Sequence, residues 1–350
     1  MKNRNDSATL LDVARIAKVS LKTASRVLND TPHIRPETAA RVRAAMSKLG
    51  YQPNELARGL KARRSAAIAM IVPNLADPFT ATAVQAVQAV AREHGHVVVL
   101  ASSGGDIDLE KSELRVMARR QIDGAILVPA SAKASSLDEL LAKKIPVVVF
   151  DEPIRGEHVD SIIVPNRRAA REATEHLLWH GYRRILAVGA RPYLFTCVER
   201  VAGYRQAMKM AGAEKVELLV QHEKELTPDS LSGYLFGPSR VDAIFTLNWV
   251  CTILVLRVLN AMGKKVGKDV AIISFDDFEL AEMIAGGLTV VRQPSHELGR
   301  QAAEVLFDRI SGPDRYDPRK VVVDTEFIVR GSCGCGKGAP AWTPNKSTNR

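Results

Sequence analysis

Apolar and polar positions follow two different patterns along this chain of 350 residues, and the change comes near residue 66. Before that point, apolar residues recur every three or four positions, which is typical of short helices buried on one side. After it, short apolar runs alternate with longer amphipathic segments. This alternation predicts a small helical domain followed by a large α/β body.

Three short helices are predicted within the first 50 residues. The first lies within TLLDVARIAKVS, where Thr9 or Asp12 can bond the amides of the first turn. The third is PETAARVRAAMSKLG, which begins at Pro36 and ends at Gly50. The residues that we expect to face inward are Leu11, Ala14 and Ile16 or Ala17 in the first helix, and Ala39, Val42, Ala45, Met46 and Leu49 in the third.

The second helix, within KVSLKTASRVLN, follows the first across a tight turn that holds no glycine. Ser20 is well placed as its N-cap, and Ala24, Val27 and Leu28 form a narrow apolar stripe. This arrangement predicts a helix-turn-helix domain whose second helix enters the major groove of DNA. A three-helix bundle with solvated cations is the alternative. The residues left on the outer face of the second helix are Leu21, Lys22, Ser25, Arg26 and Asn29.

Residues 51–65, YQPNELARGLKARRS, hold a short helical stretch between the two parts of the chain. Pro53 fixes the chain direction and Asn54 can cap a helix of about two turns, but Gly59 weakens that helix by about 1 kcal/mol relative to alanine. Because a helix this short is marginal in water, we expect it to become ordered only when it meets a partner. An ordinary basic linker is the alternative.

The body of the chain predicts parallel α/β sheets covered by helices on both faces. Its length is large for one such sheet, so two similar lobes are expected. The predicted strands are residues 66–73, 96–102, 123–130, 146–152, 160–164, 183–190, 242–248, 270–277 and 321–329, and helices between them include 81–95, 166–181, 200–212, 248–263 and 295–312.

Polar residues collect where several of these strands end. In open α/β sheets, ligands bind beyond the carboxyl ends of the strands. Polar groups that converge there between two lobes predict a cleft for a small polyhydroxylated molecule. The residues at these ends are Asn74, Asp77, Ser131, Asp151, Asn248 and Asp276.

The net charge of +10 is concentrated at the N-terminus. Residues 1–64 hold nine Arg and five Lys against three Asp and two Glu, a net charge of +9, so the remaining residues carry +1. A basic helical domain suits an anionic polymer such as nucleic acid, although a basic tail that only aids solubility is the alternative. Four scattered cysteines, with no apolar signal segment and no long apolar run, predict a cytoplasmic protein without a disulfide framework or a membrane partner.

The stretch TLLDVARIAKVSLKTASRVLND, followed by YQPNELARGLK, resembles the LacI/GalR family of bacterial transcriptional repressors, and the resemblance runs through most of residues 9–331. It divides the second helix into residues that read base edges and residues that mainly bind phosphate. The Leu21-Lys22 pair differs from the aromatic-polar pair of the best-known member, so the operator sequence does not carry over. The resemblance implies that Leu21, Lys22 and Arg26 read bases, that Ser20, Thr23, Ser25 and Asn29 touch phosphates, and that Thr9, Asn54, Ala57 and Leu60 complete the DNA-binding set.

In that family the segment after the helix-turn-helix domain is a hinge helix. It pairs with its twin from the other subunit and inserts a leucine into the minor groove. Leu60 occupies the matching position, Ala57 allows close approach, and Lys61, Arg63 and Arg64 lie near phosphates.

The resemblance also implies a two-lobed core of parallel sheets, like that of periplasmic binding proteins. The chain would cross between lobes near Val164-Pro165, near Pro294 and near Val322-Val323. The implied domains are a helix-turn-helix domain (1–50), a hinge helix and linker (51–65), an effector-binding and dimerisation core (66–331) and a disordered tail (332–350). Within the core, one subdomain comprises about 66–164 and 294–322, and the other about 165–293 and 323–331.

Several positions match the ligand site of the family. Arg200 matches its ligand-clamping arginine, Asp276 the acid that accepts from sugar hydroxyls, and Phe79 an apolar wall of the pocket. Simpler interpretations exist, because Asp77 can cap a helix that starts at Pro78, and Phe79 can belong to the core. The effector-binding set is therefore Asp77, Phe79, Asp151, Arg200, Asn248 and Asp276.

Other positions near this site depart from the family pattern or fit another role. Trp249 follows Asn248 where the family usually has an acid, and its indole can stack on a ring or fill core. Pro165 and Arg168 stand where Asp and Gly are frequent. Asp277 fits a helix cap better than a ligand contact.

Motifs for catalysis or metal binding are weak or absent. Cys333 and Cys335 form a C-x-C pair without a second pair of ligands in sequence, so no metal site is predicted. No nucleophile elbow, phosphate loop, zinc-protease motif or dinucleotide fingerprint occurs. Asp276 and Asp277 suggest hydrolysis at first, but adjacent residues at a strand end point apart. We expect no catalytic residues, no cofactor and no enzyme activity.

These features together predict a transcriptional repressor that binds a palindromic double-stranded DNA operator as a homodimer. A small sugar or sugar acid in the cleft would control its operator affinity. No leucine heptads follow residue 331, which favours a dimer over a tetramer. Two alternatives share the α/β layers: a solute-binding protein of a transport system, against which the basic head argues, and a sugar-modifying enzyme.

Overall fold

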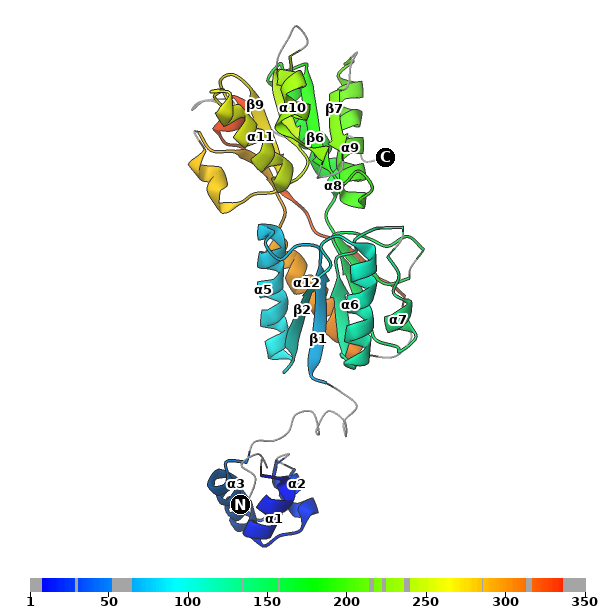
Figure 1. Ribbon diagram of the computed structural model, residues 1–350, viewed down its shortest axis with the longest axis vertical. Helices are drawn as coiled ribbons and strands as arrows, with labels where there is room; N and C mark the ends of the chain where they lie inside the picture. Colours follow the sequence, from blue (N-terminus) through cyan, green and yellow to red (C-terminus); the bar gives the residue numbers. More distant parts are fainter. Residues whose placement is uncertain are drawn as a thin grey trace. The chain divides into compact units, whose positions relative to one another are not determined.

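The chain forms two compact units, Met1–Ser65 and Ala66–Arg350 (Figure 1). A computed structural model describes residues 8–28, 31–51, 65–133, 135–156, 158–213, 217–221, 225–235, 240–284, 286–312 and 317–335.

The first unit consists of three helices, α1 (Leu10–Ala17), α2 (Leu21–Leu28) and α3 (Pro36–Leu49). Thr9 caps α1 in a reciprocal capping box with Asp12, and Gly50 ends α3 in the left-handed conformation. The predicted helix-turn-helix fold is confirmed. Its buried core is made of Val13, Ala14, Ala17, Ala24, Val27, Val42 and Ala45.

Leu11, which the pattern predicts to face inward, does not, and of the alternatives Ile16 and Ala17 it is Ala17 that is buried. Leu11 is 58% exposed and Ile16 is 44% exposed. The helix begins at Leu10, and its inward stripe runs through Leu10 and Val13 before it reaches Ala14 and Ala17. Both stripes have helical spacing, so the choice between them depends on how α1 packs on α3, which the local pattern does not encode.

The second unit contains two six-stranded sheets, one in each lobe (Figure 1). The first sheet is entirely parallel, whereas in the second the edge strand β12 runs antiparallel to β10. The order in the first sheet is β11 (Lys320–Val322), β5 (Asp160–Ile163), β4 (Val147–Phe150), β3 (Gly124–Leu127), β1 (Ala67–Val72), β2 (Val97–Ser102); that in the second is β12 (Glu326–Ile328), β10 (Thr289–Arg292), β9 (Ala271–Phe275), β8 (Ala243–Thr246), β6 (Ile185–Ala190), β7 (Glu217–Gln221).

Helices cover both faces of the first sheet, as the continuous apolar strands predict. Successive side chains of a strand point to opposite faces, so Ile68 and Met70 of β1 belong to one core and Ala69 and Ile71 to the other. The helices on the first of these faces are α5 (Pro78–Glu93) and α12 (Ser295–Ser311), and those on the second are α6 (Ile107–Arg119) and α7 (Asp138–Leu141).

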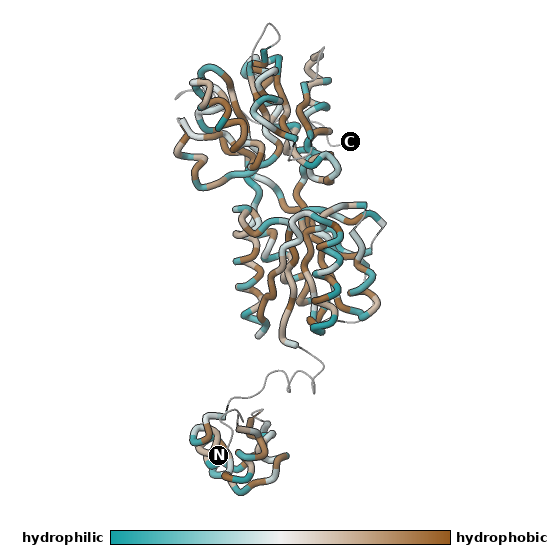
Figure 2. Tube along the Cα trace, viewed as in Figure 1, coloured by the Kyte–Doolittle hydropathy of each residue, from teal (hydrophilic) through white to brown (hydrophobic). Residues whose placement is uncertain are grey.

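The second sheet is layered in the same way. Ile185 and Ala187 of β6 face one layer of helices, and Leu186 and Val188 face the other. Figure 2 shows the strands as largely hydrophobic and the helices as mixed, in agreement with burial of one side of each helix. The helices are α8 (Asn166–Trp179) and α9 (Phe195–Met210) on one face and α10 (Pro228–Leu235) and α11 (Trp249–Ala261) on the other; the short 3-10 helices η2 (Glu279–Met283) and η3 (Gly331–Cys333) complete this lobe.

The chain passes between the two sheets three times. It leaves the first sheet after β5, returns to it through α12 after β10, and leaves it again after β11. The segment 321–329, predicted as one strand, is therefore two strands that belong to different sheets. The strands β7 and β10 were not predicted, because β7 is a partly exposed edge strand with polar ends and β10 has only four residues.

Candidate DNA-binding and effector sites

The outer face of α2 presents apolar and cationic side chains together. Leu21 is 49% exposed, Lys22 and Arg26 are also exposed, and Ala24 and Val27 are buried against the other helices. The Arg26 guanidinium donates a hydrogen bond to the carbonyl oxygen of Pro32 at 3.2 Å. This face can contact a polyanion or base edges without loss of core packing.

The hydroxyl groups at the helix starts are already engaged in capping. Ser20 Oγ accepts from the backbone N–H of Thr23 at 3.1 Å and lies 2.9 Å from Thr23 Oγ1, so the expected N-cap is confirmed. Thr9 Oγ1 donates to the carboxylate of Asp12 at 2.6 Å, and Ser25 is half-buried. The other predicted DNA-binding residues, Asn29, Asn54, Ala57 and Leu60, lie outside the described residues.

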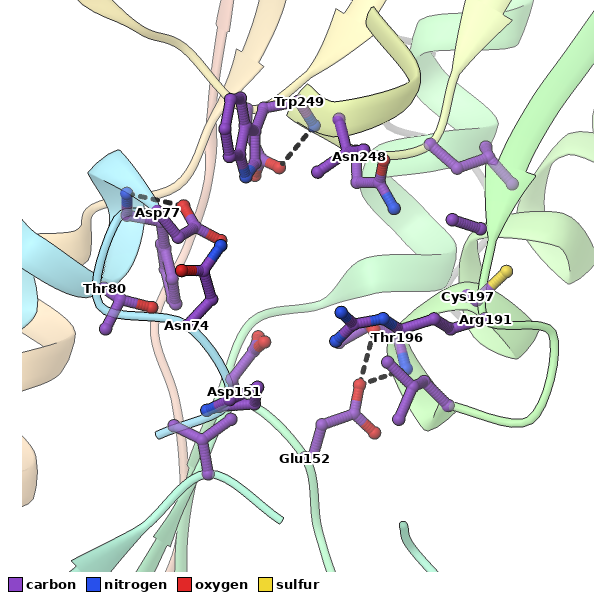
Figure 3. Close-up of a pocket in the computed structure, with 18 of the residues that line it drawn as sticks. Asn74, Asp77, Thr80, Asp151, Glu152, Arg191, Thr196, Cys197, Asn248 and Trp249 are labelled. Atoms are coloured by element: carbon purple, nitrogen blue, oxygen red, sulfur yellow. Dashed lines mark hydrogen bonds between the residues drawn. The ribbon is translucent and has the colours of Figure 1, made fainter. Parts of the chain in front are cut away.

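A cavity of about 130 Å³ opens between the two lobes at the carboxyl ends of the strands. Figure 3 shows side chains from both lobes directed into it. Ser131, which also follows a strand, does not line it. All six residues predicted to bind an effector do line it: Asp77, Phe79, Asp151, Arg200, Asn248 and Asp276.

Asp77 and Phe79 also have the structural roles that the sequence left open, and Asn248 has a capping role that was not predicted. Asp77 caps α5, because its Oδ1 accepts from the N–H of Phe79 at 3.0 Å. Phe79 stacks on Phe150, with ring centroids 5.4 Å apart, and still borders the cavity. Asn248 caps α11 by accepting from the N–H of Cys251 at 2.9 Å. Capping and cavity lining are therefore compatible here.

Arg200 is held rigidly at the wall of the cavity. The residue lies on α9 and is only 4% exposed. Its Nε donates to Asn166 Oδ1 and its Nη1 to the carbonyl oxygen of Leu247, both at 2.7 Å. Its Cζ lies 3.6 Å from the centroid of the Phe275 ring. A cation fixed in this way is preorganised to bind a polar ligand.

Glu152 joins the two lobes at the cavity, although no motif in the sequence marks it. It follows β4 in the first lobe, is 2% exposed, and accepts from the N–H groups of Phe195 and Thr196 at 2.7 and 3.0 Å. These groups form the N-terminus of α9 in the second lobe, whose own N-cap residue, Leu194, supplies no side-chain bond. A carboxylate at this position accepts hydrogen bonds from N–H groups that have no partner within the helix, and its charge interacts favourably with the positive end of the helix dipole.

The cavity is rich in carboxyl groups, which interact with one another. Burial, together with the charge of Asp276, raises the pKa of Asp77 to about 6. Burial and the neighbouring Glu152 raise the pKa of Asp151 to about 8, although Arg200 opposes this. Burial also raises the pKa of Glu152. The cavity therefore disfavours additional negative charge, and at neutral pH Asp151 can donate a hydrogen bond as well as accept one.

The cavity also has polar and aromatic lining that was not predicted as such. Gln293 donates to Asp276 Oδ1 at 2.6 Å, and the backbone N–H of Trp249 donates to Asp276 Oδ2 at 3.2 Å. The Trp249 side chain borders the cavity rather than being fully buried. Gln293 was not predicted because it follows β10, a strand of four residues that was itself not predicted.

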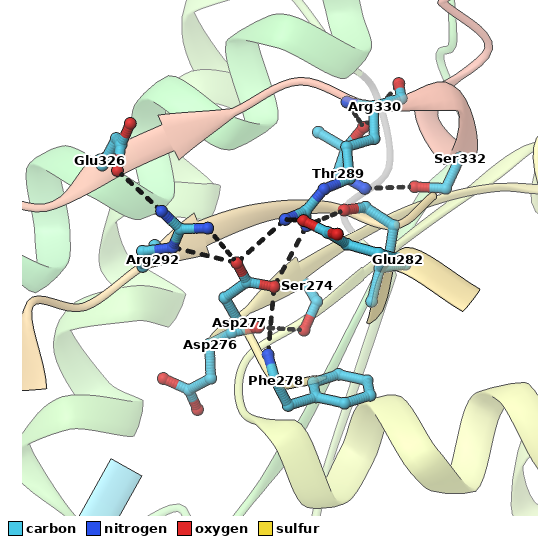
Figure 4. Close-up of polar contacts among 11 residues, drawn as sticks. Ser274, Asp276, Asp277, Phe278, Glu282, Thr289, Arg292, Glu326, Arg330 and Ser332 are labelled. Carbon is cyan, nitrogen blue, oxygen red and sulfur yellow. Dashed lines mark hydrogen bonds and ion pairs between the residues drawn. The ribbon is translucent and has the colours of Figure 1, made fainter. Parts of the chain in front are cut away.

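Asp277 points away from Asp276 and from the cavity, as expected for adjacent residues (Figure 4). Arg292 Nη2 lies 2.7 Å from Asp277 Oδ2, and Arg330 donates to both carboxylate oxygens at 3.1 Å. Burial tends to raise the pKa of Asp277, but hydrogen bonds from Arg330 and Arg292 outweigh it and lower the pKa overall. The prediction that Asp277 caps a helix is wrong, since η2 follows Phe278 and has no side-chain cap.

The fold and the cavity define a class of protein, namely a helix-turn-helix regulator with a periplasmic-binding-protein-like core. Residues 9–54 match the model of bacterial regulatory proteins of the lacI family, and residues 174–333 match the periplasmic binding protein-like domain. The HTH-type transcriptional regulator CelR of Thermobifida fusca is 33% identical over 341 residues, which cover 94% of this chain and 99% of that protein. The chain therefore belongs to the LacI family, and the predicted resemblance is confirmed.

Further relatives agree with this assignment. The HTH-type transcriptional repressor PurR of Photobacterium profundum is 30% identical over 331 residues, covering 93% of this chain and 98% of that protein. A transcriptional regulator CelR–cellobiose complex is similar in structure, with a TM-score of 0.67, 31% identity and coverage of 93% of this chain and 99% of that one. These relatives are regulators of transcription rather than enzymes.

A solved structure of lower sequence identity has a similar fold. The lac repressor dimer bound to operator and the anti-inducer ONPF has a TM-score of 0.80 at 21% identity, with coverage of 94% of this chain and 99% of that one. Among the helices of the described residues, none combines the length and the hydropathy that crossing a membrane requires.

Proposed function

We propose that this protein represses transcription by binding a palindromic operator as a homodimer, and that an uncharged sugar in the inter-lobe cavity controls its operator affinity. The observation that carries the proposal is the cavity itself, where Asp77 and Asp151 of one lobe meet Arg200, Asn248 and Asp276 of the other. A ligand bound by both lobes stabilises one arrangement of the lobes relative to others.

The charge of the cavity favours a neutral ligand over a sugar acid. Asp77, Asp151, Glu152 and Asp276 line it together with only two arginines, Arg191 and Arg200. Because neighbouring carboxylates already raise the pKa of Asp151, an anionic ligand would add repulsion, whereas sugar hydroxyls can donate to carboxylates and accept from Arg200. The relative whose structure contains cellobiose supports the same class of ligand.

Asp151 is the residue that we expect to distinguish most sharply between a neutral sugar and an anionic ligand. Its Oδ1 is buried and has no hydrogen-bond partner among the described residues. A buried, unsatisfied carboxyl oxygen is costly unless a ligand or water bonds it. A sugar hydroxyl at this point would satisfy the oxygen, and Trp249 and Phe79, which line the same cavity, provide apolar surface for the ring.

On the DNA side, α2 is the element that we assign to the major groove. Lys22 and Arg26 can each donate to guanine, and Leu21 can pack on a thymine methyl group. In a homodimer, two such helices would read half-sites about one helical turn apart. Glu152 offers a path for coupling, since it links the end of β4 to α9 across the ligand cavity.

The test begins with selection of operator fragments from random double-stranded DNA by the full-length protein. Thermal stability and operator affinity are then measured with neutral mono- and disaccharides, the matching sugar acids, and nucleobases. We expect a neutral sugar to raise the melting temperature and to change operator affinity at least about fivefold, a usual size for allosteric coupling. Stabilisation by sugar acids or nucleobases alone would reject the ligand class, and absence of any selected site would reject the DNA-binding role.

A pair of variants ties the effect to the cavity. Asp151→Ala removes the unsatisfied carboxyl and should abolish stabilisation by the sugar while the selected operator is still bound. Asp308→Ala removes an exposed carboxylate that pairs with Arg319 elsewhere in the first lobe, and it should respond like the wild type. Equal responses of the two variants would contradict the assignment of Asp151.

A further inference from the structure

Two histidines and two cysteines meet in the second lobe, apart from the effector cavity. They are His176, His180, Cys333 and Cys335, and their ligand atoms all lie within 4.8 Å of one another. None of the four lines the cavity. The C-x-C pair near the C-terminus thus acquires the second pair of ligands that the linear sequence did not show.

The local structure explains how the four residues converge. His176 and His180 are four residues apart in the chain, with His180 directly after the end of α8, so both imidazoles lie on the same side. Cys333 ends η3, and Gly334 takes the left-handed conformation with φ of +90°, which turns the chain so that Cys335 returns toward α8. This left-handed conformation favours glycine, and a Cβ at position 334 would in addition lie 2.5 Å from the Tyr182 hydroxyl.

The distances between donor atoms are close to those of a tetrahedral site. His176 Nε2 lies 3.2 Å from Cys333 Sγ and 3.6 Å from Cys335 Sγ, and His180 Nε2 lies 2.8 Å from Cys335 Sγ. With Zn–S bonds of about 2.3 Å and Zn–N bonds of about 2.0 Å, nitrogen and sulfur ligands lie about 3.5 Å apart. Small side-chain shifts would bring these nitrogen–sulfur pairs to this spacing, and all four atoms already lie within 4.8 Å of one another.

The surroundings suit a bound metal ion. His176 and Cys333 are buried, whereas Cys335 is partly exposed and leaves a path for entry. The Thr289 hydroxyl lies 2.9 Å from the carbonyl oxygen of Arg330 and 3.2 Å from Cys333 Sγ, so its one proton can turn to a thiolate in the way that outer-shell groups support metal ligands. Two sulfurs and two imidazoles are a ligand set that zinc prefers.

We propose that His176, His180, Cys333 and Cys335 bind one zinc ion in a closed structural site. Four protein ligands leave no open coordination position, so the site is not catalytic. The ion would fasten the segment from η3 to Cys335 onto α8 and so fix the end of the second lobe. The competing states are a Cys333–Cys335 disulfide and a hydrogen-bonded cluster without metal.

The experiment uses the full-length protein, purified without a histidine tag or chelator and kept reduced. We expect about one zinc per chain by elemental analysis. Replacement by cobalt(II) should give the strong visible bands of tetrahedral cobalt and a thiolate-to-cobalt charge-transfer band. Cys335→Ser and His180→Ala should each lower zinc affinity at least about tenfold, since even outer-shell changes have effects of this size. In Cys335→Ser the charge-transfer band should also weaken, because one of two thiolates is lost.

Matched control variants distinguish the loss of a metal-binding side chain from general destabilisation of the fold. Cys251→Ala and His158→Ala remove the same kinds of side chain at sites outside the cluster and should retain the metal and the cobalt spectrum. Absence of bound metal from the reduced wild-type protein after zinc addition would overturn the proposal. Retention of wild-type affinity by both Cys335→Ser and His180→Ala would overturn it as well. Neither outcome depends on sugar or operator binding.

Discussion

Asp151 and Asp276 occupy equivalent positions in the two lobes. Each follows a phenylalanine that ends a central strand, Phe150 of β4 and Phe275 of β9, and each has a left-handed backbone, with φ of +64° and +80°. A residue other than glycine pays roughly 1 kcal/mol or more for this conformation. Both carboxyl groups line the same cavity, and the charge of Asp276 helps to raise the pKa of Asp151. Strain kept at two matched positions supports a role in ligand binding.

The raised pKa of Asp151 predicts how the stability of the ligand-free protein depends on pH. The carboxyl has a pKa of about 8 in the folded protein, against an ordinary value of 3.8. Between these values the folded chain holds a proton that the unfolded chain releases, so the free energy of unfolding falls as pH rises, by up to about 1.4 kcal/mol per pH unit. Asp151→Asn cannot ionise, and it should show a shallower decline in urea unfolding midpoints from pH about 5 to about 8.

The control for this measurement is Asp308→Asn, which alters an exposed ion pair and should keep the wild-type slope. Parallel pH profiles for the wild type and Asp151→Asn would show that the carboxyl is ionised throughout this range.

The packing of α9 on α8 predicts a large penalty at Gly203. A Cβ at this position would lie 2.1 Å from the carbonyl oxygen of Arg167 and 2.9 Å from the backbone nitrogen of Arg171. Since both are backbone atoms of α8, the helices would have to separate, and Gly203→Ala should lower the free energy of unfolding by about 1–3 kcal/mol or more. Gly233, in α10, has open space around its Cβ position. Gly233→Ala should therefore raise stability by up to about 1 kcal/mol, and losses of equal size in the two variants would refute the close contact.

The ion pairs of Asp277 with arginine predict a contribution to stability whose pH dependence is opposite to that of Asp151. Asp277→Asn removes charge-assisted hydrogen bonds to Arg292 and Arg330 and should cost about 2 kcal/mol at neutral pH. Because the pKa of Asp277 is lowered in the folded protein, this contribution is present above the ordinary pKa and is lost as pH falls through the lowered value. Unfolding midpoints of the variant and the wild type should therefore converge in acid.

Asp324→Asn is the matched control for Asp277→Asn. Asp324 pairs with Arg168 at an exposed position, and such pairs contribute at most about 1 kcal/mol. If Asp324→Asn lowered the free energy of unfolding more than Asp277→Asn, the expectation that the partly buried pairs of Asp277 contribute more than an exposed pair would be contradicted.

Residues whose roles depend on local pattern were predictable from the sequence. The buried strands around Met70, Val148 and Phe245 are continuous apolar runs, and Ser20 stands where a cap is required. Of the six predicted residues that line the cavity, Asp77, Asp151, Asn248 and Asp276 come after strands, as the rule for strand ends expects. Phe79 and Arg200, which lie within α5 and α9, were identified by their match to the family.

Roles that depend on distant contacts were not predictable. Glu152 acts through an N-terminus 43 residues away, and the partners of Cys333 and Cys335 lie more than 150 residues earlier in α8 and just after it. Leu11 and Ile16 show the same limit on a smaller scale, since two stripes of α1 have helical spacing and tertiary packing selects one. Spacing along the chain identifies chemistry, but only the fold decides which groups meet.

Lys22 offers a direct test of how α2 reads DNA. Its side chain is exposed in the first turn of α2, on the face opposite the buried Ala24 and Val27. A lysine that donates to a base edge should matter more for a selected operator than for random duplex DNA, whereas a phosphate contact weakens both equally. Lys22→Ala should thus weaken operator binding by about 1–3 kcal/mol, roughly 5- to 150-fold, and broaden the sequences recovered by selection.

The control for Lys22→Ala is Lys268→Ala, which removes the same charge from the second unit and should leave operator affinity unchanged. Because the first 64 residues carry +9, wild-type affinity should also fall steeply with salt concentration. An equal loss for operator and random DNA in Lys22→Ala would place this lysine on the phosphate backbone and would leave Leu21 and Arg26 to carry sequence recognition.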